Sequence, residues 1–515
     1  MNGAESLART LLRSGVDVCF TNPGTSEMHF VAALDRVEGM RCVLGLFEGV
    51  VTGAADGYAR MAGRPAGTLL HLGPGLGNGL ANLHNARKAQ TPVVNIVGEH
   101  AVRHLAHDAP LTADIEGIAR PVSAWVKTST SAREVARDGA EAVAAARTAP
   151  GQVATLILPA DTAWEEGTGA AEPVPVPPAP QVDDSRVRAA VDALRSGQPT
   201  VLLMTGRVLH EDGLALAGKV AASTGTRLMA QMANKRIARG AGRVTVERVP
   251  YPVDQALATF ADVRHIVLVG AKPPVAFFAY PGKPSELWPK GCEVHSLAEA
   301  HEDCMHALEA LVDALGASGA RPAFQALERP SVPTDERLSV ETVCATIGAL
   351  MPENAVVTDE AISTGRGLHP YTKGAPPHDW LAICGGSIGI GLPLATGAAV
   401  ACPDRKVLAL QADGSAMYTI QALWTQAREG LDITTLLFSN RAYGSLKHEL
   451  HNVGASNPGR KALDMLEIGR PDLDFVSIAR GMGVAATRVT STSELARAMR
   501  AGLASGGPNL VEVML

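Results

Sequence analysis

An aspartate and an asparagine each follow a short apolar run near the C-terminal end of the chain. The runs cover residues 407–411 and 433–438, a pattern that is typical of buried strands. Asp413 comes just after the first run and Asn440 just after the second. Between them, residues 415–430 carry apolar side chains at helical spacing and end at a glycine. A strand–helix–strand crossover makes its strands parallel, so both polar residues are expected at one edge of a sheet, where open α/β sheets bind ligands.

The residue types at this edge predict a magnesium ion that holds a diphosphate. Mg²⁺ prefers oxygen ligands, uses few protein groups and completes its shell with water and phosphate oxygens. Gly414 lets the backbone approach closely, and the N–H groups of a helix that starts at Ser415 favour an anion. The alternative is purely structural: Asp413 caps the helix and Asn440 forms a turn.

The composition is that of an ordinary globular protein. Of 515 residues, 46% are hydrophobic and 19% charged, and a net charge of −6 without a long basic run argues against nucleic acid as a partner. Seven scattered cysteines without C-x-x-C spacing argue against a disulfide framework and a zinc site. No apolar stretch approaches the roughly 18 residues that cross a membrane, and "MNGAESLARTLLRSG" has the pattern of an amphipathic helix, without a signal peptide's apolar core. We expect a cytoplasmic enzyme.

Apolar runs alternate with helical patterns along the whole chain, which predicts an α/β protein with three doubly wound parallel-sheet domains. The first domain is expected over residues 1–165 and the central one over 186–325. Between them, residues 166–185 are rich in proline and predict an extended linker. The third domain is expected over residues 335–515.

Two separated stretches resemble a known cofactor motif. "ADGSAMYTIQALWTQ" followed by "SNRAYG" resembles the diphosphate-binding motif of thiamin-diphosphate enzymes, written G-D-G, about 25 residues, then N-N. The Asp-to-Asn distance of 27 residues fits, although Ala412 replaces the first glycine and Ser439 the first asparagine. The resemblance implies that Mg²⁺ is held by Asp413, Asn440 and the backbone carbonyl of Ala442. It also implies further cofactor contacts at Gly414, Ser415, Tyr443, Ser363 and Thr364.

The first domain resembles the other half of the same cofactor site. Glu48 follows the apolar run "CVLGLF" and opens the stretch "EGVVTGAADGYAR", which is similar to the family element that carries the activating glutamate. Thiamin diphosphate needs a carboxylate beside its aminopyrimidine ring, to push that ring toward the imino tautomer. A helix dipole also favours an N-terminal acid, which explains Glu48 alone but not its agreement with the distant Asp413 motif. The resemblance therefore names the first domain pyrimidine-binding and the third diphosphate-binding.

A glycine-rich stretch, "CGGSIGIGLPLATGAA", resembles the family segment under the bent cofactor. By resemblance, Ile388 supports the bend, and the Gly386 carbonyl accepts a hydrogen bond from the pyrimidine amino group. Gly- and Ala-rich helices also pack closely for structural reasons alone.

Two further segments, "TNPGTSEMHF" and "LLHLGPGLGNG", most resemble benzoylformate decarboxylase and acetolactate synthase. Thr25 stands where the decarboxylase carries a serine near the substrate carboxylate, and His71 matches a histidine that moves protons. The decarboxylase's second histidine has no counterpart in the central stretch "GAKPPVAFFAYPGKPSELW", which offers Phe277, Phe278 and Tyr280. That departure favours carboligation over protonation. Acetolactate synthases commonly bind FAD in this domain, but we find no FAD signature and expect none bound.

The resemblance spans nearly the whole chain and implies a thiamin-diphosphate- and Mg²⁺-dependent decarboxylase or carboligase acting on a small 2-oxo acid. A benzoylformate-decarboxylase-like reaction is the first expectation, and acetolactate-synthase-type carboligation is the alternative. Family active sites lie between subunits, so a homodimer or homotetramer is expected. Two other hypotheses stay open: a non-catalytic relative, and a dinucleotide-binding loop at "HLGPGLGNG", which lacks the third glycine of that fingerprint.

Overall fold

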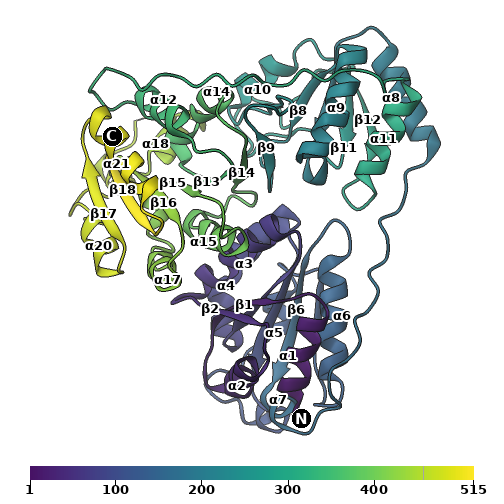
Figure 1. Cartoon of the computed structure of the whole chain (residues 1–515), viewed down its shortest axis with the longest axis vertical. Helices are drawn as coiled ribbons and strands as arrows, with labels where there is room; N and C mark the ends of the chain where they lie inside the picture. Colours follow the sequence, from purple (N-terminus) through teal and green to yellow (C-terminus); the bar gives the residue numbers. More distant parts are fainter. Residues whose placement is uncertain (456) are drawn as a thin grey trace.

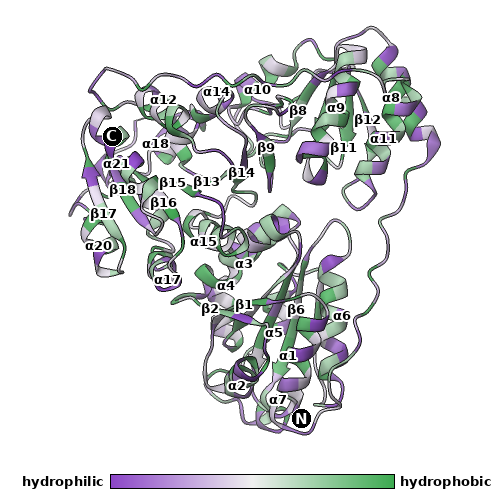
Figure 2. Ribbon diagram, in the orientation of Figure 1, coloured by the Kyte–Doolittle hydropathy of each residue, from purple (hydrophilic) through white to green (hydrophobic). Residues whose placement is uncertain are grey.

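The computed structural model describes residues 1–455 and 457–515 and contains three β-sheets flanked by helices (Figure 1). The first and second sheets are entirely parallel, and the third is parallel except for one edge strand. The prediction of three parallel-sheet α/β units is therefore confirmed. Hydrophobic residues concentrate in the strands, and polar residues gather on the outer sides of the helices (Figure 2).

The first sheet has six strands in the order β2-β1-β3-β4-β6-β5. Its strands are β1 (Val18–Asn22), β2 (Arg41–Leu44), β3 (Ala66–Leu70), β4 (Val93–Glu99), β5 (Trp125–Thr128) and β6 (Val153–Pro159). Its main helices are α1 (Gly3–Arg13), α2 (Met28–Arg36), α3 (Glu48–Ala62), α4 (Leu72–Ala89), α5 (Ile115–Ala119), α6 (Val135–Arg147) and α7 (Ala160–Trp164). Helices α1, α2 and α6 pack on one face, and α3, α4 and α5 on the other.

An extended segment without helix or strand, residues 167–183, leads from the first sheet to the second (Figure 1). The second sheet has the order β10-β8-β7-β11-β12. Its strands are β7 (Thr200–Met204), β8 (Arg227–Ala230), β10 (Glu247–Arg248), β11 (His265–Val269) and β12 (Glu293–Ala298). Its helices are α8 (Asp184–Arg195), α9 (Glu211–Thr224), α10 (Val253–Phe260) and α11 (Cys304–Ala314).

The third sheet has seven strands in the order β17-β18-β16-β15-β13-β14-β9. Its strands are β13 (Ala355–Glu360), β14 (His378–Ala382), β15 (Val407–Ala412), β16 (Ile433–Ser439), β17 (Ala485–Val489), β18 (Asn509–Met514) and β9 (Ile237–Arg239). Its helices are α12 (Val340–Leu350), α13 (Ile362–Gly365), α14 (Leu368–Thr372), α15 (Gly391–Ala401), α16 (Asp413–Ala416), α17 (Ala422–Glu429), α18 (Gly444–Asn452), α19 (Arg460–Asp464), α20 (Phe475–Gly481) and α21 (Thr492–Ala504).

Strand β9 belongs to the central part of the sequence but pairs with β14 of the third sheet, in antiparallel orientation. The central segment therefore supplies an edge strand to its neighbour. The domain boundaries given by the sequence stay a prediction. They assign β9 to the central domain, although this strand pairs within the third sheet.

Helices α3 and α15 join the first domain to the third (Figure 1). A Cβ atom on Gly397 would lie 1.8 Å from the Ala54 carbonyl oxygen, and one on Gly57 would lie 2.2 Å from the Leu394 carbonyl oxygen. Only glycine lets the two backbones approach this closely. One hydrophobic cluster consequently runs from the first sheet through both helices to the third sheet.

A buried ion pair reinforces this contact. Arg60 and Asp56 have fully buried side chains, with Nη2 of the arginine 2.6 Å from Oδ2 of the aspartate. The same guanidinium donates to the carbonyl of Ala382 (2.7 Å) at the end of β14. Gly57 and Arg60 of the "ADGYAR" stretch therefore contact the third domain, whereas the buried Tyr58 donates to Oδ1 of Asp17 within the first domain.

Among the described residues, no helix combines the length and the apolar character that a bilayer crossing requires.

We predict that Gly397→Ala destabilises the folded protein by about 2–3 kcal/mol, because the new methyl group would meet rigid backbone. The free energy of unfolding from chemical denaturation measures the effect. Gly481→Ala is the matched control, since Gly481 is also helical and has no atom within 4 Å of the added carbon. Equal stabilities of the two variants would contradict the proposed close contact.

Candidate functional site

Two polar side chains lie at the carboxyl edge of the third sheet. Asp413 directly follows β15, and Asn440 directly follows the neighbouring parallel strand β16. The Asp413 carboxylate is buried and accepts hydrogen bonds from the N–H groups of Gly414 (2.8 Å) and Arg441 (2.7 Å). The Asn440 side-chain oxygen accepts from the N–H of Ala442 (3.0 Å). The structure therefore brings the predicted metal ligands to one edge.

The donor set at this edge fits a hard divalent cation. Burial raises the pKa of Asp413, and the surrounding backbone N–H groups only partly oppose this effect. A cation would stabilise the ionised carboxylate that burial disfavours. The carboxylate of Asp413, the amide oxygen of Asn440 and a carbonyl at Ala442 are all oxygen ligands of the kind that Mg²⁺ prefers. Gly414 has no room for a side chain, because the ring of Tyr443 packs against it.

The helix predicted over residues 415–430 is wrong in part. One short helical turn, α16, ends at Ala416, and α17 begins only at Ala422 before ending at Gly430 as expected. The Ser415 hydroxyl donates to the Ala412 carbonyl and accepts from the side chain of Gln411. A four-residue helix offers little of the dipole on which the expected anion preference depended.

Strained backbone marks the same sheet edges. Leu72, Ile362 and Arg441 have backbone φ angles of +47°, +48° and +57°, which residues other than glycine rarely adopt. Each lies two residues after the carboxyl end of a strand: β3, β13 and β16 respectively. Such strain costs on the order of 1–3 kcal/mol and clusters at functional sites.

Ser363 and Thr364, the two further predicted cofactor contacts, lie on α13, and Ser363 is next to the predicted metal ligand Asn440. Its hydroxyl accepts a long hydrogen bond from the Asn440 side chain (3.5 Å). Thr364 is buried, and its backbone N–H donates to Ala361.

A buried glutamate holds the glycine-rich segment that contains Gly386 and Ile388. The Glu360 carboxylate, at the end of β13, accepts hydrogen bonds from the N–H groups of Gly389 (2.7 Å) and Gly391 (2.8 Å). It also accepts from Ile390 (3.2 Å) and from the Gln411 side chain (2.9 Å). This clamp fixes the segment from the side of the third sheet.

The same segment is fixed from the first domain by an asparagine on α4. The Asn85 side chain accepts from the N–H of Gly385 and donates to the carbonyl of Ser387 (2.7 Å). On the central-domain side, the Phe277 ring packs against Gly386: a Cβ there would lie 2.7 Å from its Cζ atom. Phe277 also contacts Tyr251 and Phe278, with ring centroids 5.6 and 4.8 Å apart. This glycine-rich segment, called the hinge segment below, therefore contacts all three domains.

Glu48 is the first residue of α3 and lies at the carboxyl edge of the first sheet. Its Oε2 atom accepts a hydrogen bond from the side chain of Asn78 (3.0 Å) on α4. Gly75 faces the other carboxylate oxygen, 3.3 Å from where its Cβ would be. The carboxylate is half-buried and remains accessible from one side.

His71 forms a pair with a residue that the sequence reasoning missed. Its Nδ1 atom lies 2.8 Å from Oε2 of Glu27, which is 1% exposed and also accepts from the N–H of Gly24 (2.6 Å). Burial raises the pKa of Glu27, while the Gly24 N–H and His71 partly offset that effect. Gly24 must be glycine, since any Cβ would collide with the imidazole. Thr25, two residues before Glu27, is exposed.

Both ends of the chain match family models. Residues 1–118 match the thiamine pyrophosphate enzyme N-terminal TPP binding domain, and residues 364–513 match the corresponding C-terminal TPP binding domain. A Mycobacterium tuberculosis protein, provisionally named acetolactate synthase large subunit IlvX, is 53% identical over 100% of this chain and 99% of its own length. The benzoylformate decarboxylase of Pseudomonas aeruginosa is 30% identical over 98% of this chain and 97% of its own.

The chain belongs to the thiamin-diphosphate-dependent enzymes.

A solved structure supports the fold assignment. The thiamin diphosphate-dependent 4-hydroxybenzoylformate decarboxylase of Rhodococcus jostii RHA1 superimposes with a TM-score of 0.84. It is 24% identical, and the match covers 100% of this chain and 99% of that one.

The family assignment implies that the two sheet edges bind opposite ends of the same cofactor. Asp413, Asn440 and Ala442 would hold the metal and diphosphate end of the cofactor, and Glu48 would face its pyrimidine end. These roles stay predictions for this chain, but the geometry fits them: oxygen donors at one edge, and an accessible carboxylate at the other.

Sequence reasoning missed the residues that position the site. Glu360 ends the apolar run "AVVTD", and Asn82 and Asn85 lie three residues apart on one helix. Two sequence signals for these positioning residues were available. One is a polar residue at the end of a strand, and the other is a pair of amide side chains in a helix composed mostly of small residues. Neither signal identifies its partner, because the partners are about 30 to 300 residues away in sequence.

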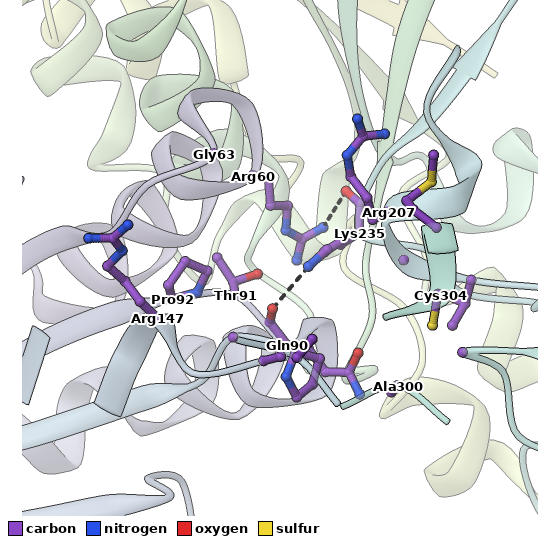
Figure 3. Close-up of a pocket in the computed structure, with 18 of the residues that line it drawn as sticks. Arg60, Gly63, Gln90, Thr91, Pro92, Arg147, Arg207, Lys235, Ala300 and Cys304 are labelled. Carbon is purple, nitrogen blue, oxygen red and sulfur yellow. Dashed lines mark hydrogen bonds between the residues drawn. The ribbon is translucent and has the colours of Figure 1, made fainter. Parts of the chain in front are cut away.

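A cavity of about 520 Å³ lies between the first and central domains (Figure 3). It opens at the carboxyl ends of β7 and β11, where the strand order of the second sheet reverses and where open sheets often bind ligands. Several cations that line it already have protein partners. Lys235 donates to the carbonyl of Gln90 (3.1 Å), Arg60 pairs with Asp56, and Arg207 pairs with Asp212.

We predict that Glu27→Gln lowers thiamin-diphosphate-dependent turnover about 100-fold and flattens its pH profile, because His71 loses its anionic partner. The loss should not reflect unfolding. The pKa of Glu27 is raised in the folded protein, so its ionisation costs stability above that pKa, and the variant should be at least as stable at pH 8. Glu38→Gln, at an exposed glutamate of the same domain, is the control. A wild-type pH profile in Glu27→Gln would refute the pairing.

Proposed function

We propose that the chain decarboxylates a small 2-oxo acid with thiamin diphosphate and Mg²⁺, in the manner of benzoylformate decarboxylase. The observation that carries this proposal is the His71–Glu27 pair, which supplies a proton-transferring group at the same sheet edge as Glu48. The 30% identity to a named benzoylformate decarboxylase over nearly the whole chain supports it.

When bound, thiamin diphosphate supplies a thiazolium carbanion and a ring that accepts the electrons released as CO₂ leaves. The chain's own residues handle position and protons. Glu48 would exchange a proton with the aminopyrimidine, and the Asn78 amide orients its carboxylate. His71, with Glu27 behind it, would deliver or remove a proton on the substrate side. Thr25, the exposed first residue of the 3₁₀ helix that also contains Glu27, would contact the substrate carboxylate.

Carboligation of the acetolactate synthase type is the second candidate. The relative at 53% identity carries that name. The central domain places Phe277 against Gly386, with Tyr251 next to Phe277, and its sequence offers no second acid–base histidine in the stretch around Phe277. With His71 as its one histidine proton donor, the site would protonate the substrate carbon less readily, which would favour carbon–carbon bond formation with a second carbonyl compound.

We further propose that FAD is not required. No FAD signature is present in the sequence, and Lys235, Arg60 and Arg207 at the central cavity already have partners within the protein. These contacts leave fewer cations free for a dinucleotide diphosphate.

The test is turnover of a panel of 2-oxo acids, including benzoylformate and pyruvate, with thiamin diphosphate and Mg²⁺ but without FAD. We expect CO₂ release from at least one acid, with an aldehyde product for decarboxylation and an acyloin or acetohydroxy acid for carboligation. Glu48→Gln should reduce the rate by at least about 100-fold while cofactor binding, measured by calorimetry, is retained. Failure of the wild-type protein to bind thiamin diphosphate with Mg²⁺, or wild-type turnover by Glu48→Gln, would overturn the assignment.

We also propose that the active site lies between two subunits, with Glu48 and Asp413 contributed by different chains of at least a homodimer. Exposed apolar residues near the site edges support this arrangement, including Leu46 and Tyr418 with exposed fractions of 49% and 52%.

Mixing two inactive variants tests this arrangement. Glu48→Gln and Asp413→Ala, each inactive alone, should regain about a quarter of wild-type activity when co-expressed, because half of the dimers then contain one intact site of two. If both groups act within one chain, the mixture should stay as inactive as either variant. Co-expression of each variant with itself at the same level is the control.

A further inference from the structure

Three chemically matched side chains meet at the amino ends of two strands in the second sheet, far from any residue assigned to the cofactor. His265 begins β11, and Glu293 begins the neighbouring edge strand β12. The two residues are direct partners in the parallel pairing, and His295 follows Glu293 by two positions. Side chains two apart on a strand share one face, so all three project from the same side of the sheet.

The ligand atoms form a compact triangle. Nδ1 of His265 lies 3.1 Å from Nε2 of His295, while Oε2 of Glu293 lies 3.8 Å from the first and 3.6 Å from the second. A point in the plane of these atoms is about 2.0 Å from each of them, and this is the bond length of Zn²⁺ to imidazole nitrogen and carboxylate oxygen. The spacing of the three atoms therefore fits a single ion.

We propose that His265, Glu293 and His295 form a binding site for a late first-row divalent metal ion, with Zn²⁺ as the best match. Two imidazoles and one carboxylate prefer such ions over Mg²⁺, which favours all-oxygen sites like the one at Asp413. This site is independent of the proposed function.

The surroundings suit a site that stabilises the sheet. The side chains of His265 and His295 are 13% and 21% exposed, while Glu293 is 68% exposed. The imidazoles are thus held by packing, and an ion can enter from the side of the carboxylate. An ion here would cross-link β12, the edge strand, to β11 at the end opposite the central cavity.

Hydrogen bonding alone accounts for only part of this arrangement. One imidazole can donate to the other across 3.1 Å, but neither nitrogen is within hydrogen-bond distance of Glu293 Oε2. A carboxylate 3.6–3.8 Å from both nitrogens matches a shared ion better than direct contact.

The proposal is tested by zinc titration of the full-length protein. The protein is kept saturated with Mg²⁺, so that the Asp413 edge is not available to zinc. We expect about one zinc ion per chain and a higher melting temperature, since an ion that binds only the folded state stabilises it. Glu293→Gln and His295→Gln should each weaken zinc binding by about tenfold or more.

His301→Gln is the matched control, because His301 is in the same domain and its Nδ1 lies 3.5 Å from Glu299 Oε2, with no third ligand among the residues that the structure describes. If His295→Gln does not fold, Glu293→Gln still decides the question, since its exposed side chain tolerates the change. Unchanged zinc affinity in the Glu293 and His295 variants, or no zinc bound by the wild-type protein, would overturn the proposal.

Discussion

The close crossing of α3 and α15 is the contact on which the rest of the molecule depends. Gly57 and Gly397 let two backbones from different domains touch, and the buried Asp56–Arg60 pair continues the contact to the end of β14. The crossing fixes the first sheet relative to the third. Because the candidate residues lie at the edges of both sheets, this interface, together with the Asn85 contacts to Gly385 and Ser387, sets their relative placement within a chain. A side chain at either glycine would separate the edges before it affected any catalytic group.

Buried carboxylates perform the fine positioning. Glu360 holds three successive N–H groups of the hinge segment, and Glu27 holds both Gly24 and His71. Burial raises the pKa of each, so each is costly to ionise and is retained only where its hydrogen bonds are useful. Glu27 differs from Glu360 in one respect: its Oε1 atom has no partner among the described residues. The Glu27 carboxylate, with one oxygen lacking a hydrogen-bond partner, is suited to exchange a proton with His71. Glu360, which accepts several N–H hydrogen bonds, is instead suited to holding the backbone in position.

The sequence sufficed for the features that depend on local pattern. The strands that precede Asp413, Asn440 and Glu48 were predicted from short apolar runs, and parallel pairing then placed Asp413 beside Asn440. Prediction from the sequence failed where tertiary contacts override local preference.

The apolar spacing of residues 415–430 continues through a break in the helix, because both short helices pack toward the same core. Strand β9 has only three residues, too few for a periodic signal, and its pairing with β14 depends on a partner about 140 residues away. The His71–Glu27 and His265–Glu293–His295 groupings could not be foreseen for the same reason, since strand register and loop geometry create them.

The central domain has a larger part in the site than its lack of cofactor motifs suggests. Strand β9 anchors it to the third sheet, and next to β9 the Arg236 guanidinium donates to Asp379 on β14 (2.8 Å). Burial opposes ionisation of Asp379, but Arg236 and Arg405 more than offset it, and its pKa is lowered. The contact between the central domain and the third sheet is therefore ionic as well as hydrogen-bonded, and the Phe277 ring of the central domain packs against Gly386. In the first and third domains, strand ends provide the polar groups of the proposed chemistry.

The central domain instead provides aromatic side chains beside the hinge segment. Differences in substrate between relatives of this fold can therefore arise from the position of this domain, with the cofactor residues unchanged.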